Sequence, residues 1–289
     1  MRILVCGGTG FIGRHIVQAL RAAGHEPVVR SRHTTPALDY VQATDAGAWH
    51  AHLEGVDAAI NAVGVLRDSA TRPMAAVHDA APRALFDACA EAGVRRVVHI
   101  SALGIEGNPT RYASTKRAAD AHLLALTQAG RLDGTVVRPS VVFGAGGNSS
   151  QLFLTLARLP VLLLPRPVQR ARVQPVAVRD LAEAVARLVQ ESAHPGIVEW
   201  GGPRALPLGE LIASLRAQQG HAPARVGTLP DWATQASARA GDWVPVSPWC
   251  SETLALLATD NVTDPRTLAE LLGRPGVAPE QLVATLHAG

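Results

Sequence analysis

Short apolar runs alternate with longer amphipathic stretches through the first half of the chain. The amphipathic stretches predict helices over residues 11–23, 45–53, 75–92 and 111–129. The apolar runs between them are rich in Val and Ile, as strands buried on both faces are, and they read RILVCG, EPVVR, DAAINAVG, RRVVHIS and GTVVRPS. This alternation is typical of βαβ units. It predicts an α/β fold with a doubly wound parallel sheet whose ligand lies at the carboxyl ends of the strands.

The pattern becomes irregular after FGAGGNSS at residues 143–150, where prolines at 160, 165, 167 and 175 interrupt it. We therefore expect a first domain over residues 1–147 and a smaller C-terminal substrate lobe over residues 148–289. Within the lobe, RVQPVAV (172–178) and GIVEWGG (196–202) are expected to form strands that pack back on the main domain.

The most apolar stretch of the chain is LFLTLARLPVLLLP, residues 152–165. Arg158 and Pro160 interrupt it, and it is shorter than the roughly 20 apolar residues that cross a bilayer. We expect a core helix followed by a buried strand here. A segment that lies on a membrane surface or docks on a partner is the alternative.

Charge and cysteine usage narrow the classes of partner and compartment. The formal net charge is +3 over 289 residues and no long block of like charges is present, which argues against nucleic acid as a partner. The three cysteines lie far apart and, like the scattered histidines, show no metal-ligand spacing, so we expect reduced thiols and no metal site. MRILVCGG runs directly into a strand and a turn with no leader pattern, so we expect a cytoplasmic location.

A glycine-rich turn, GGTGFIG, follows the first predicted strand at once and opens the first helix. Gly7 allows a tight turn, Gly10 lets the backbone approach a pyrophosphate, and Gly13 lets helix and strand pack closely. The helix start would then offer unpaired N–H groups and a partial positive charge to the phosphates. We therefore predict a dinucleotide-binding Rossmann domain whose turn holds the cofactor through Gly7, Thr9, Gly10, Phe11, Ile12 and Gly13.

The end of the second predicted strand indicates which dinucleotide binds. An NAD site usually places an acidic residue there to hold the ribose hydroxyls, whereas EPVVRSRH offers Arg30 and Arg32. Both can bind a 2′-phosphate through charge-assisted hydrogen bonds, so NADP(H) is favoured over NAD(H). Arginines on a solvated loop are the alternative. Adenine and ribose would lie at the end of a further, third strand expected between EPVVR and DAAINAVG, beside Thr44 and Asp45. They would also lie at the end of DAAINAVG, the fourth strand, beside Asn61, Ala62, Val63 and Gly64.

RYASTK, residues 111–116, contains one of the two tyrosines and the only lysine of the chain, since the other 26 basic residues are arginine. At a spacing of four on the predicted helix, Tyr112 and Lys116 share one face. A free phenol has a pKa near 10, so about one tyrosine in a thousand is ionised at neutral pH, and a nearby ammonium favours the phenolate. Lysine supplies a compact charge for this purpose, which the planar fork of arginine does not. Ser101, which closes the fifth predicted strand, is the candidate to polarise a substrate oxygen.

Together these motifs resemble the short-chain dehydrogenase/reductase superfamily, in its extended or atypical branch. GGTGFIG, INAVG, HISALG, the Tyr112 and Lys116 pair and VVRPSVVFG appear in the order of that family and cover about the first 145 residues. HISALG, YASTK and LATDNVTDP look like the subgroup that includes the NADPH-binding accessory subunit of respiratory complex I and its bacterial relatives. The resemblance implies that Ser101 orients a carbonyl, Tyr112 transfers the proton and Lys116 holds the nicotinamide ribose. Pro139 and Val142 of VVRPSVVFG complete the expected cofactor-binding set.

Two positions depart from the family pattern. Cys6 stands where many members have threonine, beside the pyrophosphate turn. Ser101 is followed by Ala102 and Leu103, where extended members often have paired serines. If the catalytic hydroxyl belongs one or two positions later, the expected triad is incomplete.

The favoured function is an NADP(H)-dependent oxidoreductase that exchanges hydride with a carbonyl or hydroxyl carbon of a small-molecule substrate, while Tyr112 exchanges the proton. Nucleotide-sugar epimerase or dehydratase chemistry is one alternative. The other is a protein that holds NADPH without turnover, as a structural, assembly or sensor component, and it implies association with a membrane surface or a respiratory complex. Helices 75–92 and 111–129 would form the contact of a homodimer.

Overall fold

The chain folds into two compact units. The computed structural model describes residues 1–32, 34–191, 195–244, 249–257 and 259–286. The two units consist of residues 1–139 with 179–199, and of residues 140–178 with 200–289.

The first unit is built on a six-stranded sheet in the order β10-β5-β4-β3-β1-β2. Its strands are β1 (Arg2–Cys6), β2 (Glu26–Arg30), β3 (Ala58–Asn61), β4 (Arg96–Ile100), β5 (Asp133–Pro139) and β10 (Gly196–Trp200). Strands β1 to β5 pair in parallel, and one register row near their carboxyl ends contains Cys6, Arg30, Asn61 and His99. The predicted doubly wound parallel sheet is confirmed.

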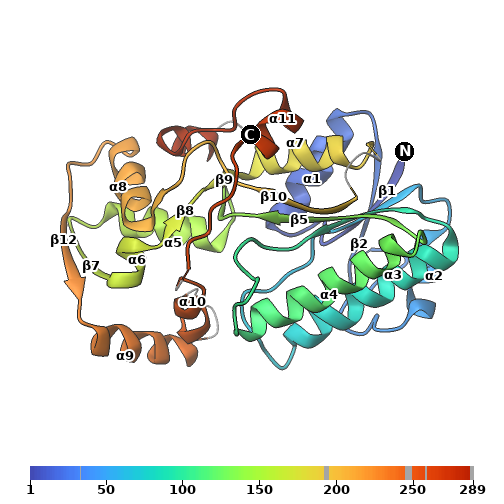
Figure 1. The fold of residues 1–289 in the computed structure, drawn as a ribbon, viewed down its shortest axis with the longest axis horizontal. Helices are drawn as coiled ribbons and strands as arrows, with labels where there is room; N and C mark the ends of the chain where they lie inside the picture. The colour runs from blue at the N-terminus through green and yellow to red at the C-terminus, as the bar shows by residue number, and fades with distance from the viewer. Residues whose placement is uncertain (33, 192–194, 245–248, 258, 287–289) are drawn as a thin grey trace. The chain divides into compact units, whose positions relative to one another are not determined.

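Helices cover both faces of this sheet. Figure 1 shows α1 (Phe11–Ala22) and α7 (Val178–Leu188) on one face, and α3 (Ala81–Ala92) and α4 (Arg111–Gln128) on the other. A π-helical turn, Ala75–Ala80, leads directly into α3. The helix expected over residues 45–53 is a 3-10 turn, Ala46–Trp49, followed by the short α2, His50–Leu53.

The main apolar core of the first unit lies under α3 and α4. Leu4, Phe86, Val97 and Leu123 are fully buried there, and so is the indole of Trp49. Burial of such large side chains stabilises the fold by roughly 1.5 to 3 kcal/mol each. The strands are therefore fixed from both faces, which holds their carboxyl ends in register.

The strand expected before Thr44 and Asp45 is absent from the described residues between β2 and α2, and this expectation was wrong. Asp45 caps the 3-10 turn instead, because its Oδ1 accepts a hydrogen bond from Ala48 N at 3.1 Å. The ring of Tyr40 packs edge-on against Trp49, with ring centroids 5.5 Å apart. β2 is therefore the last strand of the sheet on this side.

The division between the units lies after residue 139, before the boundary expected after residue 147. The chain leaves the first sheet at the end of β5, and β6 (Val142–Phe143) already pairs with β9 (Val176–Ala177). The segment 172–178 therefore belongs to the second unit, and its packing on the main domain stays a prediction. The return to the first unit is made by α7 and by β10, which contains most of the second expected segment, 196–202.

The second unit consists of short sheets and helices. Its elements after β6 are α5 (Asn148–Arg158), β7 (Val161–Pro165), α6 (Arg166–Arg170), β8 (Arg172–Val173), β9, β11 (Leu206–Pro207), α8 (Leu208–Gln218), β12 (Arg225–Leu229), α9 (Asp231–Asp242), α10 (Ser251–Leu256) and α11 (Arg266–Leu272). Its core includes Phe143, Phe153, Leu211, Ile212 and Leu215.

The apolar stretch 152–165 forms a helix and a strand, as expected, but the strand is only half-buried. Leu162 and Leu164 face the core, whereas Val161 and Leu163 are 59% and 63% exposed. The reason is that β7 pairs with β12 alone in a two-stranded sheet, one face of which is not covered. Within the described residues, no helix is both long enough and apolar enough to cross a bilayer.

Candidate active site

The glycine turn connects β1 to α1 through a tight backbone bend. Gly10 N donates a hydrogen bond to Gly7 O at 2.9 Å, and Gly10 is the N-cap of α1. Gly7 has φ +78°, and a Cβ there would lie 2.9 Å from the carbonyl of Ala62. A Cβ on Gly13 would lie 2.1 Å from the carbonyl oxygen of Gly7. Any side chain at Gly7 or Gly13 would therefore push the turn away from β3 or from α1.

A cavity of about 470 Å³ lies beside this turn, at the carboxyl ends of β1 to β4. This volume is typical of a small-molecule site. The cavity brings together most of the residues that the sequence predicts for cofactor binding and proton transfer: Gly7, Thr9, Gly10, Phe11, Ile12, Arg30, Arg32, Ala62, Val63, Gly64, Ser101, Tyr112 and Lys116.

Six predicted residues do not line this cavity: Gly13, Thr44, Asp45, Asn61, Pro139 and Val142. Gly13 acts through packing, as described above. Pro139 ends β5, and Val142 belongs to the second unit. Thr44 is exposed, and Asp45 is used as a helix cap.

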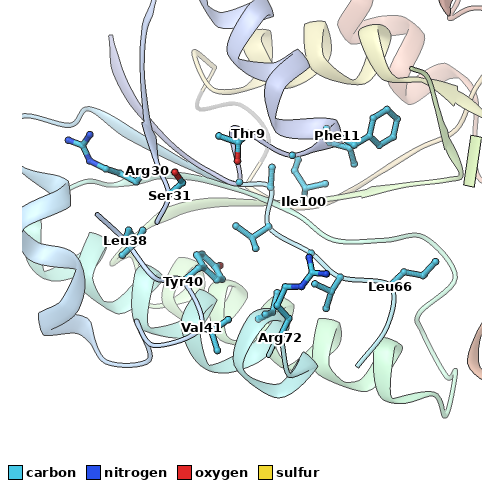
Figure 2. A pocket seen from close by; sticks show the side chains of 18 of the residues that line it. Thr9, Phe11, Arg30, Ser31, Leu38, Tyr40, Val41, Leu66, Arg72 and Ile100 are labelled. Atoms are coloured by element: carbon cyan, nitrogen blue, oxygen red, sulfur yellow. The ribbon is translucent and has the colours of Figure 1, made fainter. Parts of the chain in front are cut away.

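The wall expected from Thr44 and Asp45 is formed by residues 38–41 instead. Figure 2 shows Leu38, Tyr40 and Val41 along this wall, beside Arg30 and Ser31. The sequence gives little signal for it, because the segment has no strand or helix period. The other lining residues that the sequence prediction missed are Ser31, Val65, Leu66, Arg72, Val77 and Ile100.

Arginine side chains lie at two ends of the cavity. Figure 2 shows Arg30 toward one end and Arg72 toward the other. The Nε of Arg30 is buried and has no hydrogen-bond partner, so it is available to an anion. The wall also contains one carboxylate, Asp39, whose Oδ1 accepts from Val41 N at 3.2 Å.

Tyr112 and Lys116 lie in the first two turns of α4. Thr110 caps this helix by accepting a hydrogen bond from Ala113 N at 3.2 Å, which fixes where the first turn begins. Lys116 is only 4% exposed, and its Nζ donates to Ile100 O at 2.9 Å. Burial lowers the pKa of Lys116 to about 8, and the carboxylate of Asp120 opposes this shift. A single buried cation therefore lies on the same helical face as the phenol.

His78, which the sequence prediction missed, supports the phenol from the π-helical turn. Its ring meets the ring of Tyr112 edge-on, with centroids 5.3 Å apart. Its Nε2 must accept from Val65 N at 3.0 Å, so the ring hydrogen lies on Nδ1 and faces Thr115 Oγ1 at 3.2 Å. Burial and the charge of Lys116 lower the pKa of His78 to about 2. His78 is therefore neutral, and it holds the backbone of Val65 and the ring of Tyr112 in place.

Ser101 lies at the expected strand end, but its hydroxyl hydrogen is directed away from the cavity. It is 5% exposed, and Oγ donates to Asp120 Oδ2 at 3.0 Å. Asp120 Oδ2 also accepts from Nε of Arg138 at 3.0 Å. A carboxylate bound in this way accepts hydrogen bonds and does not donate them. Ser101 therefore offers only oxygen lone pairs to the cavity in this arrangement.

The amide of Asn61 is used inside the protein. Its Oδ1 accepts from Val63 N at 3.2 Å and from the hydroxyl of Tyr40 at 2.9 Å. Its Nδ2 is therefore the donor to His99 Nδ1, at 3.0 Å. Asn61 therefore positions residues beneath the cavity, and it does not line the cavity itself.

No metal site accompanies this arrangement. In the part of the chain that the structure describes, no group of three His, Cys, Asp or Glu side chains could hold a metal ion. All three cysteines are free and buried.

The parallel sheet, the glycine turn and the tyrosine–lysine pair define a nucleotide-binding α/β protein. A family model described as the NAD dependent epimerase/dehydratase family matches residues 3–201. The chain belongs to this family, and the resemblance to short-chain dehydrogenases and reductases is confirmed.

Curated relatives of the chain include reductases and a respiratory subunit. Ceramide reductase of Caulobacter vibrioides is 29% identical over 214 residues, which cover 68% of this chain and 63% of that protein. The 3-diazoavenalumate denitrifying reductase of a Streptomyces species is 30% identical over 260 residues, 80% of this chain and 84% of the relative. Subunit 9 of the mitochondrial NADH dehydrogenase 1 alpha subcomplex of Arabidopsis thaliana is 28% identical over 228 residues, which cover 72% of this chain and 55% of that protein. The chain thus spans less than two thirds of the first and third of these relatives.

Solved structures share the fold over nearly the whole chain. The NADPH-dependent quinone oxidoreductase QOR2 of Escherichia coli, complexed with NADPH, gives a TM-score of 0.74 at 19% identity and covers 98% of both chains. UDP-N-acetylglucosamine 4-epimerase of Bacillus cereus gives 0.73 at 18% identity and covers 98% of this chain and 96% of its own. These structures show the shared fold, and the family description, which names NAD, supports a nicotinamide dinucleotide as the cofactor class.

Proposed function

We propose that the protein is an NADP(H)-dependent oxidoreductase that exchanges hydride with a carbonyl or hydroxyl carbon of a small molecule, with Tyr112 as the proton donor or acceptor. One observation carries this proposal: Tyr112 and the buried ammonium of Lys116 line the same cavity as the glycine turn. The reductases among the relatives support the reaction type.

The residues at one end of the cavity fit the dinucleotide. Gly10, the N-cap of α1, lines the cavity without a side chain, so the backbone of the turn can approach a pyrophosphate there. Arg30 has an unpaired buried Nε, and Arg32 lies beside it on the cavity wall, so both favour a 2′-phosphate. Asp39 is the residue that would favour ribose hydroxyls and NAD(H) instead. When bound, the nicotinamide supplies or accepts the hydride.

The chain's own residues supply the proton. The phenol oxygen of Tyr112 gives its proton to a developing alkoxide or takes it from an alcohol. The positive charge of Lys116, one turn along α4, favours the phenolate. The ring of His78 holds the phenol from the side, and its neutral state adds no further charge.

The two tyrosines allow a matched test. NADPH oxidation should be measured against a panel of aldehydes, ketones and quinones, with NADPH affinity measured in parallel by fluorescence. Tyr112→Phe should reduce turnover by about a hundredfold or more and leave NADPH affinity nearly unchanged, because general acid–base catalysis contributes about 10² to 10⁴. Tyr40→Phe removes the other phenol of the cavity and should retain turnover. Equal activity of Tyr112→Phe and the unmodified protein would contradict the proposal.

A second function is favoured by the geometry of Ser101. Its hydrogen is donated to Asp120, so one donor expected for a substrate carbonyl is directed elsewhere. A protein that holds NADPH without turnover would have no need of that donor, and the likeness to the respiratory subunit fits this candidate. It predicts that NADPH copurifies, exchanges over hours and meets no acceptor in the panel. A redox-neutral epimerase would instead convert a nucleotide sugar with no net change in NADPH.

A further inference from the structure

A buried carboxylate, Asp120, lies beneath the tyrosine–lysine pair. It is on α4, one helical turn beyond Lys116, so Tyr112, Lys116 and Asp120 follow one another on the same helical face. Asp120 is 1% exposed and does not line the cavity. A fully buried carboxylate is rare unless it has a specific partner, and neither the glycine turn nor the phenol makes use of it.

Two hydrogen-bond donors, Arg138 and Ser101, and the ring of His99 face Asp120 from β5 and from β4 with the residue that follows it. Arg138, on β5, donates Nε to Oδ2 at 3.0 Å and places Nη2 at 3.0 Å from the same oxygen. Ser101, after β4, donates its hydroxyl to Oδ2. His99, on β4, turns Nε2 toward Oδ1 at 3.5 Å. Because Asn61 donates to Nδ1 of His99, the ring hydrogen of His99 lies on Nε2, the atom that faces the carboxylate.

This arrangement favours the ionised form of Asp120. The guanidinium of Arg138 and the ring N–H of His99 can only donate, and hydrogen bonds from a cation are strongest to a carboxylate. Burial raises the pKa of Asp120, but the hydrogen bond from Ser101 and the charges of Arg138 and Lys116 oppose this shift. Arg138 is itself balanced on its other side by the exposed Glu106, at 3.1 Å. The negative charge of Asp120 is therefore available to Lys116.

Lys116 needs such a partner. Its Nζ is buried against the carbonyl of Ile100, and the other titratable groups near it are His78 on the π-helical turn, Tyr112 on its own helix and His99 on β4. Both histidines are neutral, because burial and the charge of Lys116 lower their pKa values. Asp120 is the carboxylate whose charge opposes the loss of a proton from Lys116.

We propose that Asp120 is a positioning residue of the site, a buried counter-ion fixed by Arg138 and Ser101 that holds Lys116 as the ammonium. The proposal rests on the proposed function only in that Lys116 is assigned to proton transfer. The proposal gives a reason for burying the charged side chains of Lys116, Asp120 and Arg138 together, although burial of charges is energetically unfavourable. Without the carboxylate, the desolvated lysine would lose its proton near neutral pH, and the charge beside Tyr112 would be lost with it.

The single lysine of the chain makes the test direct. Protein labelled with [ε-¹³C]lysine gives one resonance, whose shift reports the charge of Lys116 without nucleotide or substrate. The unmodified protein should titrate near pH 8. Asp120→Asn should move this midpoint to lower pH by about one unit or more, because a unit negative charge one helical turn away is lost. Asp120→Glu restores the charge and should move the midpoint back toward pH 8.

The matched control is Asp133→Asn. Asp133 also pairs with a largely buried arginine, Arg96 at 3.2 Å, but it lies at the amino end of β5. Its loss should leave the lysine midpoint unchanged. If Asp120→Asn does not fold, the unmodified protein still decides: its lysine resonance should show a second, smaller inflection at acid pH, where Asp120 gains its proton.

Three outcomes would overturn the proposal. The first is a Lys116 pKa at its ordinary value in the unmodified protein, and the second is a lysine titration midpoint that Asp120→Asn does not change. The third is the absence of a second inflection of the lysine resonance at acid pH in the unmodified protein. A purely structural role of Asp120 would lower stability and leave the midpoint in place. As pH rises, Lys116 should lose its charge earlier in Asp120→Asn than in the unmodified protein. NADPH affinity, measured across the same pH range, should therefore begin to decrease at a lower pH in the variant. The lysine titration does not depend on turnover, so failure to find a substrate would count against the proposed function alone.

Discussion

The buried charge of Lys116 should weaken the fold by an amount that the structure allows us to work out. Burial lowers the pKa of Lys116 from 10.5 to about 8, and the side chain is 4% exposed. The difference, 10.5 − 8, is 2.5 units. At about 1.4 kcal/mol per unit it corresponds to about 3 kcal/mol against the charged form in the folded state. Lys116→Met should remove this penalty and lose the hydrogen bond to Ile100 O, worth about 1 kcal/mol. At pH 7 the variant should therefore be about 2 kcal/mol more stable than the unmodified protein.

The effect should depend on pH with a definite sign. Between pH 8 and pH 10.5 the unfolded chain keeps the proton on this lysine and the folded chain loses it, so the unmodified protein gains stability as pH rises. The free-energy difference between the two proteins should therefore shrink by about 3 kcal/mol across this window and change sign near its upper end. Urea unfolding followed by circular dichroism, at several pH values below 8 and above 10, measures it.

A neighbouring cation provides the control for this measurement. Arg117, the next residue on α4, donates to the backbone carbonyls of Ile105 and Asn108, and its guanidinium stays charged throughout the window. Arg117→Met should change stability by an amount that does not vary with pH. A difference for Lys116→Met that is equally flat from pH 7 to above pH 10 would refute the reasoning, because it would mean that Lys116 keeps its ordinary pKa when buried.

Two further predictions concern the dinucleotide end of the cavity. Replacement of Arg30 and Arg32 by Ala should weaken NADPH binding by about ten- to a hundredfold, because a charge-assisted hydrogen bond contributes about 1.5 to 3 kcal/mol, and should leave NADH binding nearly unchanged. Isothermal titration calorimetry with both nucleotides measures the two affinities. An equal loss of NADH affinity would argue against a 2′-phosphate site. Gly13→Ala would place a methyl group 2.1 Å from Gly7 O, so it should destabilise the protein by about 1 to 3 kcal/mol and abolish NADPH binding. The control is Gly209→Ala, whose methyl group would meet only contacts of 3.5 Å or more and should have neither effect.

Local patterns in the sequence were sufficient for the frame of the fold. The run EPVVR is β2 without a change of boundary, and helix 111–129 differs from α4 by one residue. These elements follow from near-neighbour chemistry, namely Val-rich runs, glycine turns and the Thr110 cap. The same local rules place Tyr112 and Lys116 in one cavity. A spacing of four puts both side chains on one face of α4, and that helix follows β4, whose carboxyl end lies at the cavity.

The rest of the site depends on contacts between segments far apart in the chain. Tyr40 reaches Asn61 across 21 residues, and Asn61 reaches His99 across 38. No local period marks these pairs, so the sequence did not indicate that residues 38–41 form a cavity wall or that the amide of Asn61 is bound by Tyr40 and His99. The direction of the Ser101 hydroxyl was likewise outside the reach of the sequence, because it is set by Asp120, 19 residues away on another element.

The identity of the lone lysine is best explained by its buried position. An arginine at position 116 would keep its charge at any accessible pH, and its planar fork would need several acceptors. The site offers the ammonium one backbone acceptor, Ile100 O, and one carboxylate a turn away. A compact cation with a pKa that burial can lower is the group that fits such a place. Its charge then depends on a carboxylate that Arg138 and Ser101 hold, so a substitution at Asp120 should change the chemistry at Tyr112 although Asp120 itself does not line the cavity.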